Sequence, residues 1–268
     1  MFFVFFIATI FGCTDSSLEQ ANKALDDHDL ALAEKKFREI IQKDPKKIDA
    51  LIGLGWTYQL AGEKKNAEEL FDRCLQLQSG NPDCLRGKAS IYLSNNKILV
   101  ARLLLEEALS KHPDHPGVLS SAALFWLTEG NHAKAEKTYL SLSRRFPNRA
   151  EYLLGLGESR LRQGERAKEV VEIAEKALEM PGTAVRYQAM LWALRARALV
   201  QASSGLENEN KCEETARPVL KWIEAAYDSV KYAEATGVKI PELPVLRRTI
   251  LRRKAVVLEK CPSVSPVE

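Results

Sequence analysis

The chain has 268 residues, and its 39 lysines and arginines nearly balance its 36 aspartates and glutamates. A net charge of +3 therefore gives no reason to expect a nucleic-acid-binding protein. At 46% hydrophobic and 28% charged residues, with 14 glycines and 11 prolines, the composition is typical of a folded globular protein and excludes a collagen-like or disordered chain. Four histidines, five scattered cysteines and the lack of a catalytic motif argue against an enzyme and against a metal or other cofactor.

The chain opens with an apolar segment, because residues 2–11 carry no charge and are followed by Gly12-Cys13 and a polar run. As a helix this stretch would span roughly 15 Å, about half of the hydrocarbon layer, so it is too short to cross a membrane by itself. We expect residues 1–12 to be a signal peptide. The alternatives are an ordinary secretory signal that ends near Cys13 and a buried strand, for which the rest of the chain offers no sheet.

Ile10-Phe11-Gly12-Cys13 resembles the lipobox of bacterial lipoproteins, in which a small residue precedes the cysteine that receives the lipid. The resemblance implies that Cys13 is the lipidated first residue of the mature protein and that residues 13–16 form a linker. The sequence departs from the family pattern because no lysine or arginine precedes the apolar run and because Phe11 is bulky. Thr14 stands where an aspartate would retain an enterobacterial lipoprotein in the inner membrane. We therefore expect a lipid-anchored protein that faces the periplasm, with the outer membrane favoured over the inner membrane.

Prolines recur through the middle of the chain at spacings of 37, 31, 34 and 34 residues, and they are Pro45, Pro82, Pro113, Pro147 and Pro181. The segments between them are helical in period, and small residues recur in register at two places in each segment. The first set is Gly55, Ala89, Ala123 and Gly157, and the second set is Ala33, Ala67, Ala101 and Ala135. Small residues let two helices cross closely, and a proline ends each helical hairpin.

Leu51-x-x-Leu54-Gly55-x-x-Tyr58, followed by Ala67-x-x-x-Phe71, resembles the tetratricopeptide repeat signature, with Leu51 in place of its tryptophan. The resemblance extends over residues 17–203, as about five full repeats and the first helix of a sixth. It implies an all-α fold, a right-handed superhelical solenoid of stacked helix-turn-helix repeats with C-terminal capping helices. A single hairpin of this kind cannot bury its apolar stripe, so neighbouring repeats must stack for the array to fold.

The C-terminal part departs from the repeat. Residues 184–203 resemble the first helix of a sixth repeat, but a polar loop at residues 205–210 follows where a second helix is due. We expect two longer helices at residues 213–235 and 242–260, within a helical cap that spans residues 204–261 and covers the last apolar face. Residues 262–268 are expected to be a disordered tail.

The last predicted helix is rich in basic residues, namely Arg247, Arg248, Arg252, Arg253 and Lys254. A solvated helix face is the simplest interpretation of this cluster. Contact with anionic lipid headgroups or with an acidic partner is the alternative.

Four cysteines remain once Cys13 is set aside, and an even number in an exported chain fits two disulfides. We expect Cys74 to pair with Cys84, and Cys212 to pair with Cys261, which bracket the two final helices. Buried or unpaired thiols are the alternative. His112 and His115 flank Pro113 without further ligands at a defined spacing, so we expect them to lie in a turn rather than to bind a metal.

The resemblance further implies a concave groove that is lined by one face of each first helix and that binds a peptide or helix of a partner. Tryptophan and arginine often dominate the energetics of such interfaces, although Trp56 and Trp192 could alternatively pack against a neighbouring helix. Carried over by register, the groove residues are Ile52, Trp56, Gln59, Arg86, Ser90, Ser120, Leu124, Leu154, Glu158, Arg162, Gln188, Trp192 and Arg195.

These features predict a non-enzymatic, membrane-tethered scaffold in the bacterial envelope that binds a segment of another envelope protein. The chain is similar in plan to small tetratricopeptide repeat lipoproteins that help to assemble pilus or secretion machinery, such as pilotins of secretin subunits, and to members of the outer-membrane barrel-assembly machinery. An adaptor that recruits peptidoglycan-modifying enzymes is the alternative. We expect no cofactor, no nucleic-acid partner and no small-molecule substrate.

Overall fold

The computed structural model describes residues 16–164, 166–204 and 212–264, and within these residues all regular structure is helical. The helices are α1 (Ser16–Asp26), α2 (Leu30–Lys43), α3 (Ile48–Ala61), α4 (Lys64–Leu77), α5 (Pro82–Ser94), α6 (Ile98–Lys111), α7 (Pro116–Thr128), α8 (His132–Arg145), α9 (Ala150–Leu161), α10 (Ala167–Leu178), α11 (Val185–Ala202), α12 (Cys212–Ala235) and α13 (Leu243–Lys260). The predicted all-α fold of paired helices is confirmed. The predicted signal peptide, Cys13 and residues 13–15 of the predicted linker lie outside the described residues, as does the 205–210 loop, whereas Ser16 of the predicted linker is the first residue of α1.

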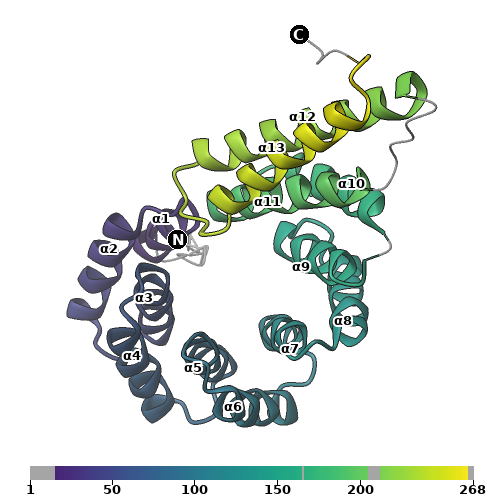
Figure 1. Cartoon of the computed structure of the whole chain (residues 1–268). Coiled ribbons are helices and arrows are strands. Elements are labelled where there is room, and N and C mark those ends of the chain that lie inside the picture. Colours follow the sequence, from purple (N-terminus) through teal and green to yellow (C-terminus); the bar gives the residue numbers. More distant parts are fainter. Residues whose placement is uncertain (1–15, 165, 205–211, 265–268) are drawn as a thin grey trace, which may run out of the picture. The chain divides into compact units, whose positions relative to one another are not determined.

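The chain divides into two compact units, residues 1–79 and residues 80–268. In the first unit, α2 packs on both α1 and α3, and α4 packs on α3. In the second unit each helix from α5 to α12 packs on the next one along the chain, and α13 packs on α12 and α11. The first helices α5, α7 and α9 form one row, with the second helices α6 and α8 beside them (Figure 1). Stacking of hairpins is therefore the architecture of each unit.

Prolines mark the turns that the 34-residue period predicts. Pro45, Pro113, Pro147 and Pro181 lie in the connections that follow α2, α6, α8 and α10. Pro82 is instead the first residue of α5, where the missing N–H of proline costs no intrahelical hydrogen bond. The side chain of Asn81 caps this helix by accepting hydrogen bonds from the backbone N–H groups of Asp83 and Cys84 at 3.0 and 3.1 Å.

Close helix packing explains the small residues. A Cβ atom placed on Gly55 would lie 2.8 Å from the ring of Phe71, and one placed on Gly157 would lie 2.6 Å from Leu194. Two further glycines, which the repeat pattern does not identify, lie even closer to a neighbouring side chain. A Cβ on Gly53 would lie 2.2 Å from Phe37, and a Cβ on Gly155 would lie 2.4 Å from Tyr139. In both cases an aromatic residue of a second helix rests on the first helix of the next hairpin. The four predicted alanines Ala33, Ala67, Ala101 and Ala135 are fully buried.

The last helices share one core. Residues of α11, α12 and α13 form a single buried cluster that includes Leu199, Leu220 and Ile250. This arrangement confirms that α12 packs on α11 in the place of a second helix and that α13 follows as a further helix. Val264 belongs to the same cluster and is 1% exposed. Val264, which was predicted to lie in the disordered tail, thus occupies a buried apolar site.

The glycine contacts predict a stability difference between two otherwise identical substitutions. Gly155→Ala forces a methyl group against the Tyr139 ring, and we expect it to lower the free energy of unfolding by about 1–3 kcal/mol. Gly117→Ala, also in a helix, meets only the flexible side chain of Arg86 and gains helix propensity, so it should leave stability unchanged or slightly raised. Urea unfolding followed by circular dichroism measures both. Equal unfolding midpoints for the two variants would contradict this packing model.

Candidate protein-binding surface

A hollow of about 520 Å³ lies where the sixth first helix, α11, meets α10 and α12. We call it the α11 hollow, and it is lined by Glu175, Leu178, Glu179, Trp192, Arg195, Ala225, Asp228 and Tyr232. The rings of Trp192 and Tyr232 stack with centroids 4.7 Å apart and planes inclined by 33°. Tyr232 is 55% exposed, so more than half of this large aromatic side chain remains accessible although it has a stacking partner. The hollow thus presents an aromatic surface to solvent.

Arg195 holds the three walls of the α11 hollow together. Its Nε and Nη2 atoms lie 2.9 and 2.8 Å from Oε1 of Glu175 on α10. Its Nη1 atom donates to the hydroxyl of Ser229 at 2.7 Å and to the carbonyl of Ala225 at 3.3 Å, both on α12. The guanidinium also lies 5.8 Å from the centroid of the Trp192 ring. Because its donors are occupied, Arg195 positions the aromatic pair rather than offering a free charge to a ligand.

The remaining charges at the α11 hollow are acidic. Glu179 is exposed, and its carboxylate makes no hydrogen bond or ion pair with any residue that the structure describes. Asp228 pairs with Lys231 at 3.2 Å, but both side chains are more than half exposed, so water weakens this pair. The carboxylate of Glu175 is neutralised by Arg195. The rim therefore favours a partner with a positive rather than a negative charge.

The predicted groove residues of α3 are half-buried. Ile52, Trp56 and Gln59 follow one another at helical spacing on this helix. The Trp56 ring meets the Phe71 ring edge-on, with centroids 5.6 Å apart, as the packing alternative for this tryptophan requires. None of the three residues lines the hollows described in this section.

The predicted residues of α5 and α7 have mixed environments. Nε of Arg86 lies 2.6 Å from Oδ1 of Asp83, one turn earlier on the same helix. Ser90 and Ser120 are half-buried, and the Ser120 carbonyl accepts a hydrogen bond from the buried Tyr139 hydroxyl at 3.1 Å. Leu124 is 49% exposed. Of this group, Leu124 offers apolar contact area.

The predicted residues of α9 and α11 are mostly held by other side chains. Leu154 is 6% exposed and belongs to the core, so it has no surface to offer a partner. Glu158 forms an ion pair with Arg197 of α11 and lies 4.0 Å from Arg162, which is about half exposed. The side-chain amide of Gln188 donates to the Thr183 carbonyl at 2.7 Å. Trp192 and Arg195 are the predicted groove residues that the structure brings together in one hollow.

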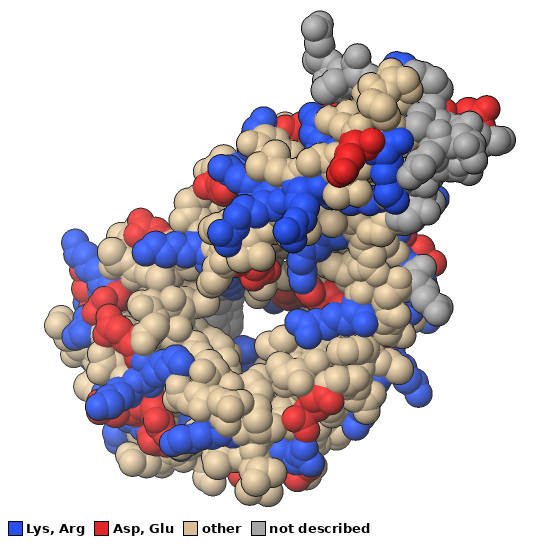
Figure 2. Space-filling view, viewed as in Figure 1, with Lys and Arg blue, Asp and Glu red and all other residues tan. Residues whose placement is uncertain are grey.

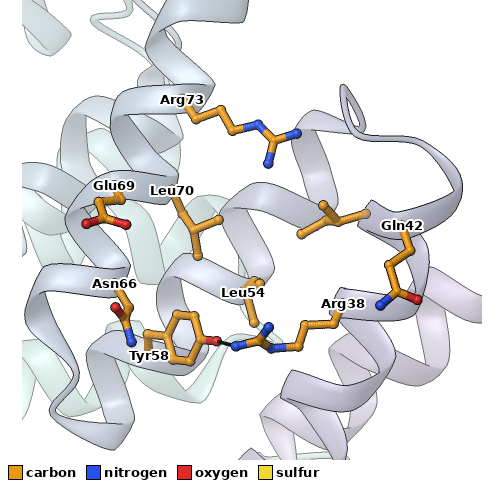
Figure 3. A pocket seen from close by; sticks show the side chains of 9 residues that line it. Arg38, Gln42, Leu54, Tyr58, Asn66, Glu69, Leu70 and Arg73 are labelled. Carbon is orange, nitrogen blue, oxygen red and sulfur yellow. Dashed lines mark hydrogen bonds between the residues drawn. The ribbon is translucent and has the colours of Figure 1, made fainter.

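Two further hollows repeat the arrangement of two second helices around one first helix. The α3 hollow has a volume of about 380 Å³ (Figure 3). It is lined by Arg38, Ile41, Gln42, Leu54, Tyr58, Asn66, Glu69, Leu70 and Arg73. The α7 hollow has a volume of about 350 Å³ and is lined by Arg102, Leu105, Glu106, Leu109, Ala122, Phe125, Trp126, Glu129, Asn131 and Lys134. The predicted groove residues all lie on first helices and include none of the residues that line these two hollows. The signal in the sequence was the pair Tyr58 and Trp126, two large aromatic residues at the same position of the repeat.

The aromatic residues of these two hollows are already covered. Tyr58 is 4% exposed, accepts a hydrogen bond from Arg38 and donates one to Oε1 of Glu34 at 2.9 Å. Burial, and then the hydrogen bond to Glu34, raise the pKa of the Tyr58 hydroxyl above its usual value of 10.0. The ammonium group of Lys134 lies 3.9 Å from the centroid of the Trp126 ring. Only in the α11 hollow, among these three, does a largely exposed aromatic ring face solvent.

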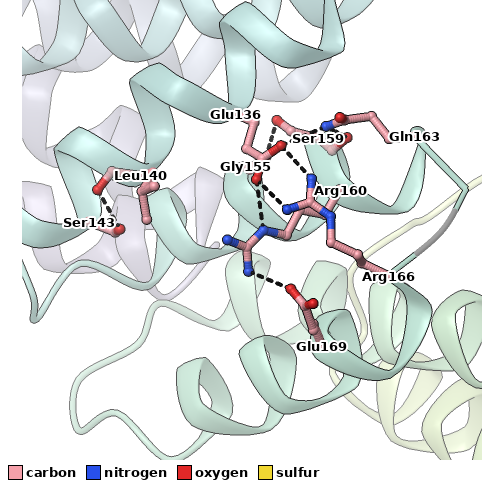
Figure 4. Close-up of polar contacts among 9 residues, drawn as sticks. All are labelled: Glu136, Leu140, Ser143, Gly155, Ser159, Arg160, Gln163, Arg166 and Glu169. Atoms are coloured by element: carbon pink, nitrogen blue, oxygen red, sulfur yellow. Dashed lines mark hydrogen bonds and ion pairs between the residues drawn. The ribbon is translucent and has the colours of Figure 1, made fainter.

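A largely buried carboxylate joins three helices of the second unit (Figure 4). Glu136 on α8 accepts hydrogen bonds from Arg160 of α9 at 3.0 Å, from Gln163 at 2.8 Å, and from both Nη atoms of Arg166 at 2.8 and 2.6 Å. The hydrogen bonds from Arg166 are the largest cause of a low pKa, about 2 instead of 4.5, for Glu136. Since every acceptor position is filled, this cluster is a clamp between repeats and not a binding site.

Three of the four cysteines in the predicted disulfides are disulfide-bonded in the structure. Cys74, Cys84 and Cys261 are fully buried, and each is disulfide-bonded. The side chain of Cys212 lies outside the described residues. The pairing of Cys74 with Cys84 and of Cys212 with Cys261 stays a prediction.

The two histidines lie in the turn between α6 and α7, His112 at the end of α6 and His115 at the start of α7. Nδ1 of His115 accepts a hydrogen bond from the Val118 N–H at 3.3 Å and so caps α7. Nε2 of His112 lies 3.0 Å from the Gly80 carbonyl oxygen. Within residues 16–164, 166–204 and 212–264, no group of three or more His, Cys, Asp and Glu side chains is arranged to hold a metal ion. Nor does that part of the chain contain a helix both long and apolar enough to span a bilayer.

Comparison with known families identifies the repeat. Two family models, both described as tetratricopeptide repeat, match residues 24–91 and residues 86–142 and 127–187. Together these matches extend over residues 24–187, which is more than half of the 268-residue chain. No curated protein matches the chain.

Solved structures share the fold at low sequence identity. A thermophilic tetratricopeptide repeat protein of Thermus thermophilus is 17% identical over 67% of this chain and 97% of its own, with a TM-score of 0.57. Pseudomonas aeruginosa pilF is 18% identical over 81% of this chain and 93% of its own, with a TM-score of 0.50. A chain of the APC/C hetero-tetramer Cut9-Hcn1 is 15% identical over 98% of this chain and 55% of its own, with a TM-score of 0.59.

The Glu136 clamp predicts how stability depends on pH. A carboxylate with a lowered pKa stabilises the fold above pH 4.5, and this stabilisation is lost as the pH falls from about 4.5 to about 2. Because one pKa unit corresponds to about 1.4 kcal/mol, the effect is at most on the order of 3 kcal/mol. Glu136→Gln should therefore destabilise the protein at pH 7 and flatten its stability profile between pH 4.5 and 2.

Glu107→Gln is the matched control, because Glu107 pairs with Lys111 while both side chains are nearly half exposed. Its removal should change the free energy of unfolding by less than about 0.5 kcal/mol. Urea titrations at a series of pH values measure both variants. If the Glu136→Gln profile runs parallel to that of the unmodified protein across this pH range, the clamp does not have the assigned role.

Proposed function

The chain belongs to the tetratricopeptide repeat family, and from this premise we propose that it binds a segment of a partner protein at the α11 hollow while a lipid on Cys13 tethers it in the bacterial envelope. Proteins of this family are generally non-catalytic scaffolds for protein–protein interaction. The scaffold role follows from the family, whereas the binding site, the tether and the compartment are the proposal.

The exposed Tyr232 ring, stacked on Trp192, is the observation that supports the binding site. An aromatic side chain buries roughly 150–250 Å² when it is fully covered, and each Å² of apolar surface contributes about 25 cal/mol. Since Tyr232 is 55% exposed, covering it would contribute about 2–3 kcal/mol. An apolar side chain of the partner would supply this cover, and Glu179 and Asp228 at the rim would favour a basic residue beside it.

The position of the α11 hollow refines the groove that the family resemblance implies. Its walls are the two second helices α10 and α12, with the first helix α11 between them. A groove made of first helices alone would draw on Leu154, which is buried, and on Trp56, which packs on Phe71. We therefore place the partner at the end of the repeat array rather than along all its first helices.

The envelope location rests on Ile10-Phe11-Gly12-Cys13 and the apolar residues before it. In this proposal the lipid on Cys13 holds the scaffold at the periplasmic face of the outer membrane. Its partner would be an envelope protein that takes part in the assembly of pilus, secretion or outer-membrane complexes. The fold similarity to Pseudomonas aeruginosa pilF agrees with such a role, although at 18% identity it extends to the fold alone.

Peptide binding tests the α11 hollow. Peptides selected from a displayed library of random 12-residue sequences against the purified chain should contain an apolar residue next to a lysine or arginine. We expect Tyr232→Ala to weaken their binding at least about tenfold, because that factor corresponds to only about 1.4 kcal/mol of lost contact. Fluorescence anisotropy with labelled peptides measures the dissociation constants.

Leu103→Ala is the control for this experiment, because Leu103 is 66% exposed but lies on α6, away from the hollow. It should leave the dissociation constants within about twofold of those of the unmodified chain. Peptides that bind Tyr232→Ala as tightly as the unmodified chain would refute the α11 hollow as the binding site. Circular dichroism of both variants establishes that their helical content is unchanged.

Cell fractionation tests the tether. Cys13→Ser removes the thiol that would receive the lipid, and we expect the protein to move from the membrane fraction to the soluble periplasmic fraction of an expressing bacterium. Thr14→Ser, at the neighbouring position, should leave the protein in the membrane fraction. Continued membrane association of the Cys13→Ser protein, resistant to high salt, would exclude lipidation at this residue as the anchor.

A further inference from the structure

The basic residues of the final helix, α13, fall into two groups according to their contacts. Three of them contact other parts of the second unit: Arg247 forms an ion pair with Glu234, Lys254 lies 3.4 Å from Glu224, and Arg253 donates to the Ser203 carbonyl. Arg248 and Arg252 are different. Both are exposed, and neither has a hydrogen bond or an ion pair with any described residue. Two arginines of the cluster are thus available to an external ligand.

Exposed aliphatic residues accompany these two arginines. Val245 is 56% exposed and Leu251 is 50% exposed. Val245, Arg248 and Arg252 follow at spacings of three and four residues, so they lie along one side of the helix, and Leu251 lies beside them. We call these four residues the basic face of α13. Lysine and arginine side chains are seen to gather over this helix in Figure 2.

Acidic residues do not interrupt the basic face. No aspartate or glutamate occurs in the sequence from Leu243 to Leu258, and the acids that α12 brings next to α13, Glu224 and Glu234, are engaged by Lys254 and Arg247. The two free guanidinium groups are therefore not neutralised by neighbouring carboxylates. Their positive charge is directed outward, next to apolar side chains.

We propose that the basic face of α13 docks on an anionic lipid surface. A guanidinium group forms paired hydrogen bonds with a phosphate, and an aliphatic side chain beside it can enter the boundary between headgroups and acyl chains. The long stems of Arg248 and Arg252 let their charged ends stay at the headgroups while Val245 and Leu251 reach deeper. A nucleic acid or a purely acidic polypeptide such as polyglutamate would pair with the arginines but would offer no apolar group to the exposed Val245 and Leu251.

The expected strength is that of a weak, orienting contact. Each basic residue near an anionic membrane strengthens binding by roughly fivefold, so two residues contribute roughly 30-fold. An affinity of this size needs a second attachment to be stable, and the lipid that we propose on Cys13 would supply it. The inference rests on the proposed tether for its biological role, but the contact itself can be measured without acylation.

Vesicle sedimentation measures the contact. The chain from residue 13 onward, carrying Cys13→Ser, is mixed with vesicles of phosphatidylcholine alone or of phosphatidylcholine with about 30% phosphatidylglycerol. We expect it to bind the anionic vesicles at least about 30-fold more tightly than the same chain that also carries Arg248→Glu and Arg252→Glu. The preference should shrink as sodium chloride rises from about 0.1 to about 0.5 M. Leu251→Ser should weaken binding to anionic vesicles by a smaller factor.

Lys137→Glu with Arg144→Glu is the matched control. Both residues are exposed on α8 without partners among the described residues, so the change in net charge is the same at a different place. This control should keep most of the binding to anionic vesicles. Equal loss in both double variants would show an effect of net charge alone and would overturn the proposal.

Two other outcomes would also overturn it. One is equal binding of the unmodified face to neutral and anionic vesicles. The other is tight binding of soluble polyglutamate in the absence of any preference for anionic vesicles, which would assign the face to an acidic polypeptide. The assay uses neither a peptide partner nor a lipidated chain. Its failure is therefore distinct from a failure of the α11 hollow or of the Cys13 tether.

Discussion

Each unit depends on the contact between an aromatic side chain of a second helix and a glycine of the next first helix. Phe37 on Gly53 and Tyr139 on Gly155 are the tightest examples, since a Cβ atom on either glycine would lie within 2.4 Å of the ring. A hairpin that relies on its neighbour in this way cannot fold as an isolated element. The contact also fixes the angle at which one hairpin follows the other, because interiors this closely packed do not tolerate an added methyl group.

Polar contacts join the same two elements at one position of the repeat. Glu34 reaches Tyr58, and Glu136 reaches Arg160, in each case from a second helix to the next first helix. The second of these is the stronger contact, because Glu136 gathers two arginines and a glutamine around a carboxylate with a pKa of about 2. Glu34 contacts Tyr58 and the largely exposed Arg38. Glu34 and Glu136 thus occupy the same position of their repeats but make contacts of different strength.

The fold could be predicted from the sequence because the repeated residues determine the path of the backbone. Small residues and prolines spaced by about 34 residues identify the hairpins and their turns, and the observed α12 and α13 begin within one residue of the predicted helices. The candidate site was harder to predict. Arg195 has the expected position, but Ser229 and Ala225 of α12, which lies outside the repeat register, occupy its donors. Likewise, nothing in the period indicates that Leu154 is buried or that Tyr232 covers Trp192.

The two surfaces that we propose for binding, the α11 hollow and the basic face of α13, both involve helices at the end of the repeat array. Inside the array, the aromatic residues Tyr58 and Trp126 are covered by neighbouring side chains, whereas single leucines such as Leu103 stay exposed. The helices α12 and α13 follow the last helix in repeat register, and they pack on each other and on α11. Tyr232 on α12 and the apolar residues of the basic face on α13 are about half exposed. A tethered scaffold with such a terminus would separate its two tasks, with the aromatic hollow for a polypeptide and the basic face for a lipid surface.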